Sequence, residues 1–155
     1  EIRTSATKAI PHPEKIFDFQ SAYGDQIFRW PHYMDQKGST WDFSKVPKEG
    51  KRQAEMLYLT DFEGDAWYEL YNPQQQLSFG MKWDKAVFRY LWMWAMYKGS
   101  FDYPWYGRAY TIALEPWTSF PTNGLTQAVA NGSAYCLSAH EQISTDMIAY
   151  VKDFH

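Results

Sequence analysis

The stretch EMLYLTDFEGDAWYELYN, residues 55–72, decides the fold class of this chain. Residues 55–62 and 66–72 are rich in aromatic and aliphatic side chains, which favour β-strands. Glu63, Gly64 and Asp65 lie between these segments and are typical of a tight turn. The stretch therefore predicts a β-hairpin.

Strand patterns continue from this hairpin to the C-terminus. Residues 72–76 predict a turn, and residues 122–132, which contain glycines near both ends, predict a short helix or turn. The strands that we expect lie at 55–62, 66–72, 76–83, 87–97, 108–115, 133–139 and 143–153. Because strand follows strand without alternating helices, the sequence predicts an all-β fold, an antiparallel β-sandwich.

Residues 1–54, which precede the hairpin, are expected to be irregular. Four prolines there break any long helix, namely Pro11, Pro13, Pro31 and Pro47. Trp30 and Trp41 are expected to anchor a long loop on the rest of the protein. We therefore expect a single domain, 1–155, whose β-sandwich portion is 55–155.

Composition narrows the classes of function. With 155 residues, 45% of them hydrophobic and 21% charged, the chain has the composition of one globular domain. The formal net charge of -3 and the lack of a basic stripe argue against nucleic acid as a partner, and no apolar run predicts a membrane span. The single cysteine, Cys136, fits a reducing compartment, so we expect a cytoplasmic protein.

Aromatic residues make up 19% of the chain and include eight tryptophans. Most such rings pack in the cores of β-proteins, but flat rings also cover the C–H faces of sugars. The two-residue alternation of a strand places five large side chains on one face of residues 87–97, namely Phe88, Tyr90, Trp92, Trp94 and Met96. We expect core packing for at least one of Trp92 and Trp94, and a ligand-binding wall is the alternative.

One carboxylate, Glu115, stands between an apolar strand and Pro116. Alternation along residues 108–115 puts one face of bulky side chains towards a core, namely Arg108, Tyr110, Ile112 and Leu114. Glu115 ends the other face, whose small side chains leave open volume in front of it. We expect Pro116 to end the strand because it has no N–H to donate. The alternative is an exposed Glu115 that pairs with Arg108 or Lys82.

Asp84, at the end of the preceding strand, adds a second carboxylate to the aromatic wall. Carboxylates accept hydrogen bonds from hydroxyl groups, and rings bury apolar C–H surface, so the combination predicts a polyol site. Besides Glu115, the candidate binding residues are Asp84, Trp92, Trp94, Arg108 and Trp117. Arg108 is also a candidate for binding a phosphate group.

Three segments resemble the C-terminal part of galactose mutarotase-like (aldose 1-epimerase) proteins: WDKAVFRYLWMW (83–94), PWYGRAYTIALEPWTSFP (104–121) and NGLTQAVANGSAYCLSAHEQIST (123–145). The resemblance covers roughly residues 55–150. It implies a supersandwich fold, the role of catalytic base for Glu115, and sugar hydroxyls as ligands of Asp84. It implies no cofactor and no metal.

The resemblance also requires an acid histidine, and this chain offers four candidates. None stands in the family's usual context. His12 and His32 are expected on the surface, with a position in a cleft as the alternative, His140 in a turn and His155 at a frayed end. Because family members are longer, we expect a portion of a larger fold, with an N-terminal half missing or a homo-oligomer. Three functions remain: a mutarotase, a sugar-binding sandwich without catalysis, or a glycoside hydrolase that uses Asp84 and Glu115.

Overall fold

The computed structural model describes residues 1–20, 26–35 and 37–154, and nearly all of its regular structure is β. The strands are β1 (Ile2–Thr4), β2 (Ala6–Pro11), β3 (Phe28–Arg29), β4 (His32–Met34), β5 (Thr40–Asp42), β6 (Gln53–Phe62), β7 (Ala66–Asn72), β8 (Leu77–Trp83), β9 (Tyr90–Tyr97), β10 (Tyr110–Trp117) and β11 (Met147–Asp153). The described residues form a single helix, α1 (Leu125–Ala130).

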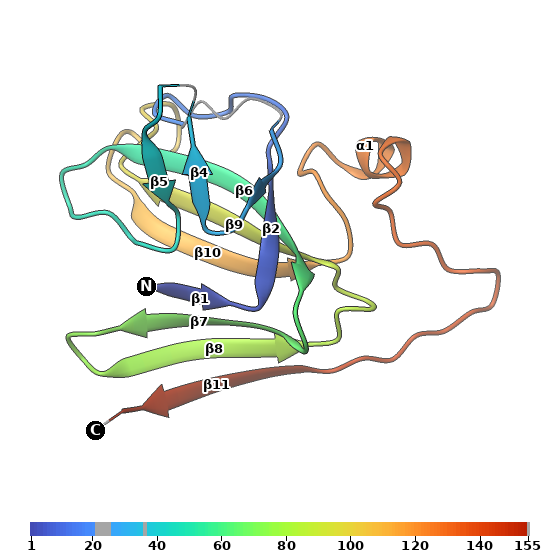
Figure 1. Ribbon diagram of the computed structural model, residues 1–155. Helices are drawn as coiled ribbons and strands as arrows, with labels where there is room; N and C mark the ends of the chain where they lie inside the picture. Colours follow the sequence, from blue (N-terminus) through green and yellow to red (C-terminus); the bar gives the residue numbers. More distant parts are fainter. Residues whose placement is uncertain (21–25, 36, 155) are drawn as a thin grey trace.

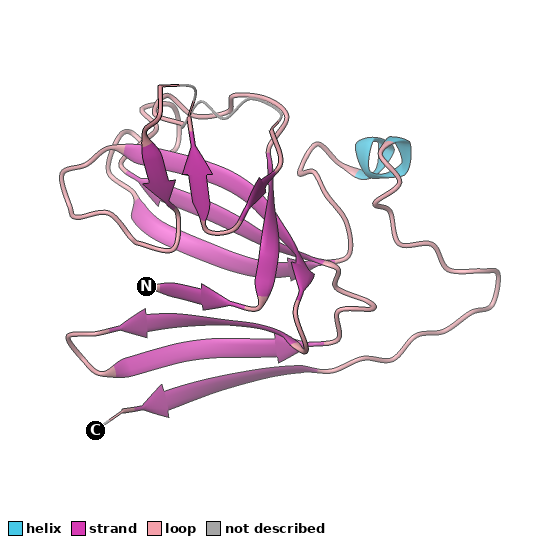
Figure 2. Cartoon of the chain, viewed as in Figure 1, coloured by secondary structure: helices cyan, strands magenta, loops and turns pink. Residues whose placement is uncertain are grey.

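The strands form two main sheets and one small one, as Figures 1 and 2 show. The five-stranded sheet has the order β10-β9-β6-β2-β3, the four-stranded sheet has the order β1-β7-β8-β11, and β4 pairs with β5. Every pairing between these strands is antiparallel. The predicted all-β, antiparallel sandwich is therefore confirmed.

The hairpin predicted at residues 55–72 is wrong, although both of its strands exist. β6 pairs with β2 and β9 in the five-stranded sheet, whereas β7 pairs with β1 and β8 in the four-stranded sheet. The chain changes sheets at residues 63–65, opposite Ser5, where β1 passes into β2. The Ser5 hydroxyl donates to the Asp65 carbonyl at 2.7 Å, and the Ser5 carbonyl accepts from Glu63 N–H at 2.9 Å. These bonds fold two paired strands around one corner, which is how sandwiches close.

Residues 1–54 are also more regular than predicted. β2 is a central strand of the five-stranded sheet, and the tryptophan-anchored segment forms the short hairpin β4–β5 rather than a long loop. Trp30 is buried in the main core and Trp41 packs against it, so their anchoring role is confirmed. The prolines lie at strand ends and in connections, where a missing N–H is tolerated.

The connection from β10 to β11 carries α1 beside the sandwich (Figure 1). The strand predicted at 133–139 does not form, and the one predicted at 143–153 shortens to β11. An apolar segment becomes a strand only where it can pair with a free strand edge. β11 pairs with the edge of β8, whereas residues 133–139 pair with no strand. No helix in the described part of the chain is long and apolar enough to cross a membrane.

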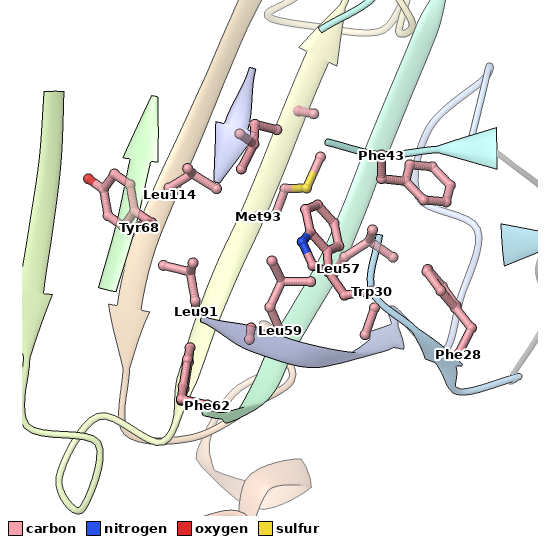
Figure 3. Close-up of a cluster of buried hydrophobic side chains, with 14 of the residues drawn as sticks. Phe28, Trp30, Phe43, Leu57, Leu59, Phe62, Tyr68, Leu91, Met93 and Leu114 are labelled. Atoms are coloured by element: carbon pink, nitrogen blue, oxygen red, sulfur yellow. The ribbon is translucent and has the colours of Figure 1, made fainter. Parts of the chain in front are cut away.

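The main core lies between the two sheets and depends on β9. Leu91, Met93 and Ala95 of β9 face this core with at most 1% of their surface exposed. Figure 3 shows Leu91 and Met93 among side chains from several strands, including Leu57 and Leu114. The intervening residues of β9 therefore point to the outer face of the five-stranded sheet.

The inner face of the four-stranded sheet is covered only in part. Tyr68 and Trp83 are buried in the core, but Phe79 and Val151 on the same face are 43% and 64% exposed. β8 and β11 thus carry apolar side chains in contact with solvent. The sequence-based expectation that this chain is a portion of a larger fold or self-associates stays a prediction.

Gly99 offers a test of the packing at the end of β9. A Cβ atom there would lie 2.3 Å from the Gln53 carbonyl carbon, and this backbone cannot give way. We expect Gly99→Ala to lower the free energy of unfolding in urea by about 3 kcal/mol. The control Gly64→Ala meets no atom within 4 Å and should cost about 1 kcal/mol through its positive φ alone. Equal losses for the two variants would contradict the close approach at Gly99.

Candidate functional site

The outer face of the five-stranded sheet carries a row of side chains from four adjacent strands. Ile10 pairs with Tyr58, Tyr58 with Trp92, and Trp92 with Glu115. The row crosses three strand spacings of about 4.8 Å, or about 14 Å in total. We call this surface the aromatic face; its cluster contains Phe17, Ala54, Met56, Tyr58 and Met96, with Trp92, Trp94, Trp105 and Phe120 packed against it.

Glu115 is exposed at one end of the row and is oriented by two tryptophans. Its Oε2 atom accepts a hydrogen bond from Nε1 of Trp117 at 2.9 Å. The Trp117 ring stacks on Trp92 with centroids 4.4 Å apart and planes at 18°. Trp117 is 42% exposed, so one side of this stacked pair faces solvent. The arrangement presents a carboxylate beside a flat apolar surface.

Trp94 extends the aromatic face along β9. Its centroid lies 4.9 Å from that of Trp105 and 6.5 Å from that of Phe17. Its cross-strand neighbour on β10 is the small Ala113, which precedes Glu115 on the same face. Of the two tryptophans predicted to line a wall, both are only partly buried and both lie on this face.

The prediction that His12 lies on the surface is wrong. His12 is 4% exposed, and its Nδ1 atom lies 2.7 Å from the hydroxyl of Tyr58. The pairing of β2 with β6 continues past Pro11, because the His12 N–H donates to the Met56 carbonyl at 3.1 Å. Burial lowers the pKa of His12 below its ordinary value, and the nearby Glu14 carboxylate opposes this shift. His12 is therefore a buried imidazole on the aromatic face, with its pKa lowered by burial.

Residues 118–122 cross the aromatic face between His12 and the strand β10. The Phe120 ring packs on Tyr58 and on Tyr90, with centroid distances of 5.2 and 4.8 Å. The Ser119 carbonyl accepts from Trp92 Nε1 at 2.8 Å, and the Phe120 N–H donates to the Ser133 hydroxyl at 3.1 Å. The segment is thus fixed to the sheet and to the chain after α1.

Two predicted binding residues, Asp84 and Arg108, make no contact with this row among the described residues. Asp84 is exposed in the turn after β8, where its carboxylate accepts the Ala86 N–H at 2.8 Å. Arg108 is exposed just before β10, and its N–H donates to the Trp105 carbonyl. Phe88, predicted to share the face of Trp92, packs against the main core instead, because the strand begins only at Tyr90.

Pro116 does not end its strand as predicted. It pairs with Leu91 inside β10, and Trp117 continues the pairing with Tyr90. β10 is an edge strand, where a proline needs no N–H on the open side. The predicted alternative partners of Glu115 were Arg108 and Lys82, but no ion pair of Glu115 occurs within the described ranges, and its partner is Trp117.

The remaining histidines lie away from this arrangement. His32 is exposed in β4 at 4.0 Å from Asp42, and His140 occupies a turn with φ of 65°, as predicted. The frayed end predicted for His155 falls outside the described residues. Within the described part of the chain, no group of three or more His, Cys, Asp or Glu side chains could hold a metal ion.

Sequence reasoning missed the contact between His12 and Tyr58. Tyr58 belongs to the opening stretch and alternates onto the outer face with Met56. Residues 6–12, ATKAIPH, show no regular apolar alternation, so the sequence offers little signal that a strand extends up to His12. Pro11 and Pro13, on either side of His12, argue against a strand at this position, because proline is rare inside strands.

A hollow of about 600 Å³ lies elsewhere, lined by Lys45, Leu70, Tyr71 and Tyr110 among others. Tyr110 begins β10, and Glu115 follows it by five residues, about 17 Å along the strand. None of the predicted site residues lines this hollow. Of the polar side chains predicted to carry chemistry, Glu115 belongs to the aromatic face, and none lines this hollow.

Comparisons with protein-family models, with curated proteins and with solved structures give no match for this chain. The resemblance to aldose 1-epimerases therefore stays a hypothesis.

The burial of His12 predicts a pH dependence of stability. Because the folded pKa lies below the ordinary value of 6.5, the unfolded chain binds a proton in the window between them that the folded chain does not. The free energy of unfolding should therefore fall as pH decreases from 6.5 towards the folded pKa. Urea titrations should show a smaller fall for His12→Asn, which removes this proton site. His140→Asn, the control on an exposed turn, should keep the dependence, and identical profiles for wild type and His12→Asn would contradict the burial.

Proposed function

We propose that this protein binds a hexose on the aromatic face and interconverts its α and β anomers. The observation that carries the proposal is the position of Glu115 and His12 on one face of one sheet. They approach the row of Tyr58 and Trp92 from opposite ends. Mutarotation needs a base and a hydrogen-bond donor, and Glu115 and His12 are the candidates for these roles on this face. Residues 118–122 cover Tyr58 between them, so this segment has to move aside for both groups to reach one sugar.

Binding is supported by the exposed parts of the tryptophans. A pyranose has C–H groups that pack on a ring and hydroxyl groups that donate to a carboxylate. The open side of the Trp117 and Trp92 stack offers the first, and Glu115 at 2.9 Å from Trp117 Nε1 offers the second. A neutral sugar also fits, because Ile10, Tyr58, Trp92 and Glu115 form no ion pair with a cationic side chain in the described part of the protein.

Anomer exchange requires the anomeric hydroxyl to lose its proton and the ring oxygen to be stabilised by a hydrogen-bond donor as its bond to C1 breaks. Glu115, as an exposed carboxylate, takes the proton from the anomeric hydroxyl. The bond from C1 to the ring oxygen then breaks, and a donor stabilises the charge that develops on that oxygen. The C1–C2 bond rotates, the ring oxygen adds to the other face of the aldehyde, and Glu115 returns its proton to the new anomeric oxygen. Each general acid or base group contributes about 10²- to 10⁴-fold to such a rate.

Glu115 suits the role of base because of where β10 places it. The strand is paired with β9 along its whole length, so the carboxylate projects from a rigid element. The hydrogen bond from Trp117 occupies one oxygen and leaves the other available to a substrate. Among the described histidines, His12 is the one on the same face, and we propose it as the donor to the ring oxygen.

A specific observation favours a second candidate function, sugar binding without catalysis. His12 is only 4% exposed and lies beside residues 118–122, so a bound sugar reaches it only if this segment moves. In that case Glu115 and the tryptophans bind the sugar and no turnover occurs. Hydrolysis is less favoured, because its second carboxylate, Asp84, is engaged in the turn after β8.

Polarimetry of freshly dissolved α-D-glucose or α-D-galactose tests catalysis. If Glu115 is the base, Glu115→Gln should lower the catalysed rate by about 10²-fold or more while sugar affinity changes little. Glu63→Gln removes an exposed carboxylate in the turn after β6 and serves as the matched control. A Glu115→Gln variant with full activity would refute the role, and a wild-type chain that binds sugar without activity would select the second candidate.

Titration calorimetry tests the binding surface independently of turnover. Trp117→Ala removes the exposed ring of the stacked pair, so affinity for the hexose should fall about 2- to 10-fold. Trp67→Phe, on the outer face of the four-stranded sheet, is the control and should leave affinity unchanged. Equal affinity of the Trp117→Ala variant and wild type would show that the sugar does not use this ring.

A further inference from the structure

We infer that Tyr58 is a positioning residue that fixes the tautomer of His12, with the proton on Nε2. The tautomer makes His12 an N–H donor towards a ligand on the aromatic face. The catalytic use of this donor rests on the proposed function. Its basis is a three-membered hydrogen-bond chain from Thr122 through Tyr58 to His12.

The donor and acceptor in each of these two hydrogen bonds follow from which groups can donate a proton. The Thr122 backbone N–H can only donate, and it reaches the Tyr58 oxygen at 3.0 Å. The Tyr58 hydroxyl has one proton of its own, and its other partner is His12 Nδ1 at 2.7 Å. If Nδ1 also carried a proton, two donors would meet the Tyr58 oxygen and the hydroxyl proton would lack an acceptor. The arrangement that satisfies all three groups has Tyr58 donating to an unprotonated Nδ1.

Burial supports this assignment of the protons, because water cannot replace the hydrogen-bond partners. Tyr58 is fully buried and His12 is 4% exposed, so water offers no easy alternative partner to either group. The Tyr58 ring is held by Trp92 at 5.4 Å and by Phe120 at 5.2 Å between centroids. Desolvation raises the pKa of Tyr58 well above its usual value, so the hydroxyl keeps its proton. The only polar groups that this hydroxyl contacts in the described residues are Nδ1 and the Thr122 N–H.

The consequence is a neutral imidazole with its proton on the second nitrogen. Neutral histidines of this kind polarise substrate oxygens without needing to be charged. For His12, this leaves the Nε2–H group as the donor to the ring oxygen under the proposed function, once residues 118–122 move aside. Tyr58 thus supplies an orientation and a tautomer rather than a contact with the sugar.

The test is the nitrogen spectrum of the full chain with ¹⁵N-labelled histidine. In the wild type we expect His12 to show a protonated Nε2 and an unprotonated Nδ1 at neutral pH. In Tyr58→Phe we expect a mixture of tautomers, because Nδ1 loses its donor. Phe120→Leu, which changes packing on the same ring without touching the hydroxyl, is the control and should leave the tautomer unchanged. A wild-type His12 that is charged or protonated on Nδ1 overturns the inference, as does an unchanged tautomer in Tyr58→Phe.

Kinetics then separate positioning from the proposed function. Tyr58→Phe should lower kcat for mutarotation by more than tenfold, but by less than the roughly 10²-fold expected for loss of a whole acid or base, with KM little changed. A full kcat in a variant whose tautomer has shifted overturns the positioning role. The nitrogen spectrum reports the hydrogen bond between Tyr58 and His12 even if the protein has no activity. If the proposed function is wrong, the wild type shows no catalysed rate. If the hydrogen bond is wrong, the spectrum shows it.

Discussion

The fold depends on one constraint, which is that β9 must bury apolar side chains on both of its faces. Leu91, Met93 and Ala95 fill the core between the sheets, while Trp92, Trp94 and Met96 face the other way. A two-sheet sandwich covers only the first face. The second face has to be covered by segments outside the sheets, and residues 12–20 and 118–122 do this through Phe17 and Phe120. The incomplete cover leaves the rings next to Glu115 partly exposed.

This constraint explains why the candidate site draws on distant parts of the sequence. Tyr58, Trp92 and Glu115 become neighbours only because β6, β9 and β10 are adjacent and in register. His12 joins them because β2 lies on the other side of β6. The corner at Ser5 makes this possible, since it sends β1 into one sheet and β2 into the other. Chemistry at this surface is therefore a property of the sheet order, not of any short motif.

Much of the sheet could be predicted from the sequence, because alternation is a local property. The strands β6 to β10 and the facing of Leu114 and Glu115 follow from residue patterns, and the structure confirms them within a few residues. Pairing could not be predicted in the same way. A turn such as residues 63–65 joins two strands in one sheet or bends the chain into a second sheet, and the choice depends on Ser5, far away in sequence. The burial of His12 was missed for the same reason, because it depends on Tyr58 and on the path of residues 118–122.

Indole resonances can show whether a sugar binds to the aromatic face of the five-stranded sheet. Each tryptophan contributes one Nε1–H signal, and the eight of them sample both sheets. Addition of galactose or glucose should move the signals of Trp92 and Trp117 at the exposed stack, and those of Trp94 and Trp105 less. Trp67 and Trp83 in the four-stranded sheet should not respond. Shifts confined to Trp67 and Trp83, or no shifts at saturating sugar, would contradict the account.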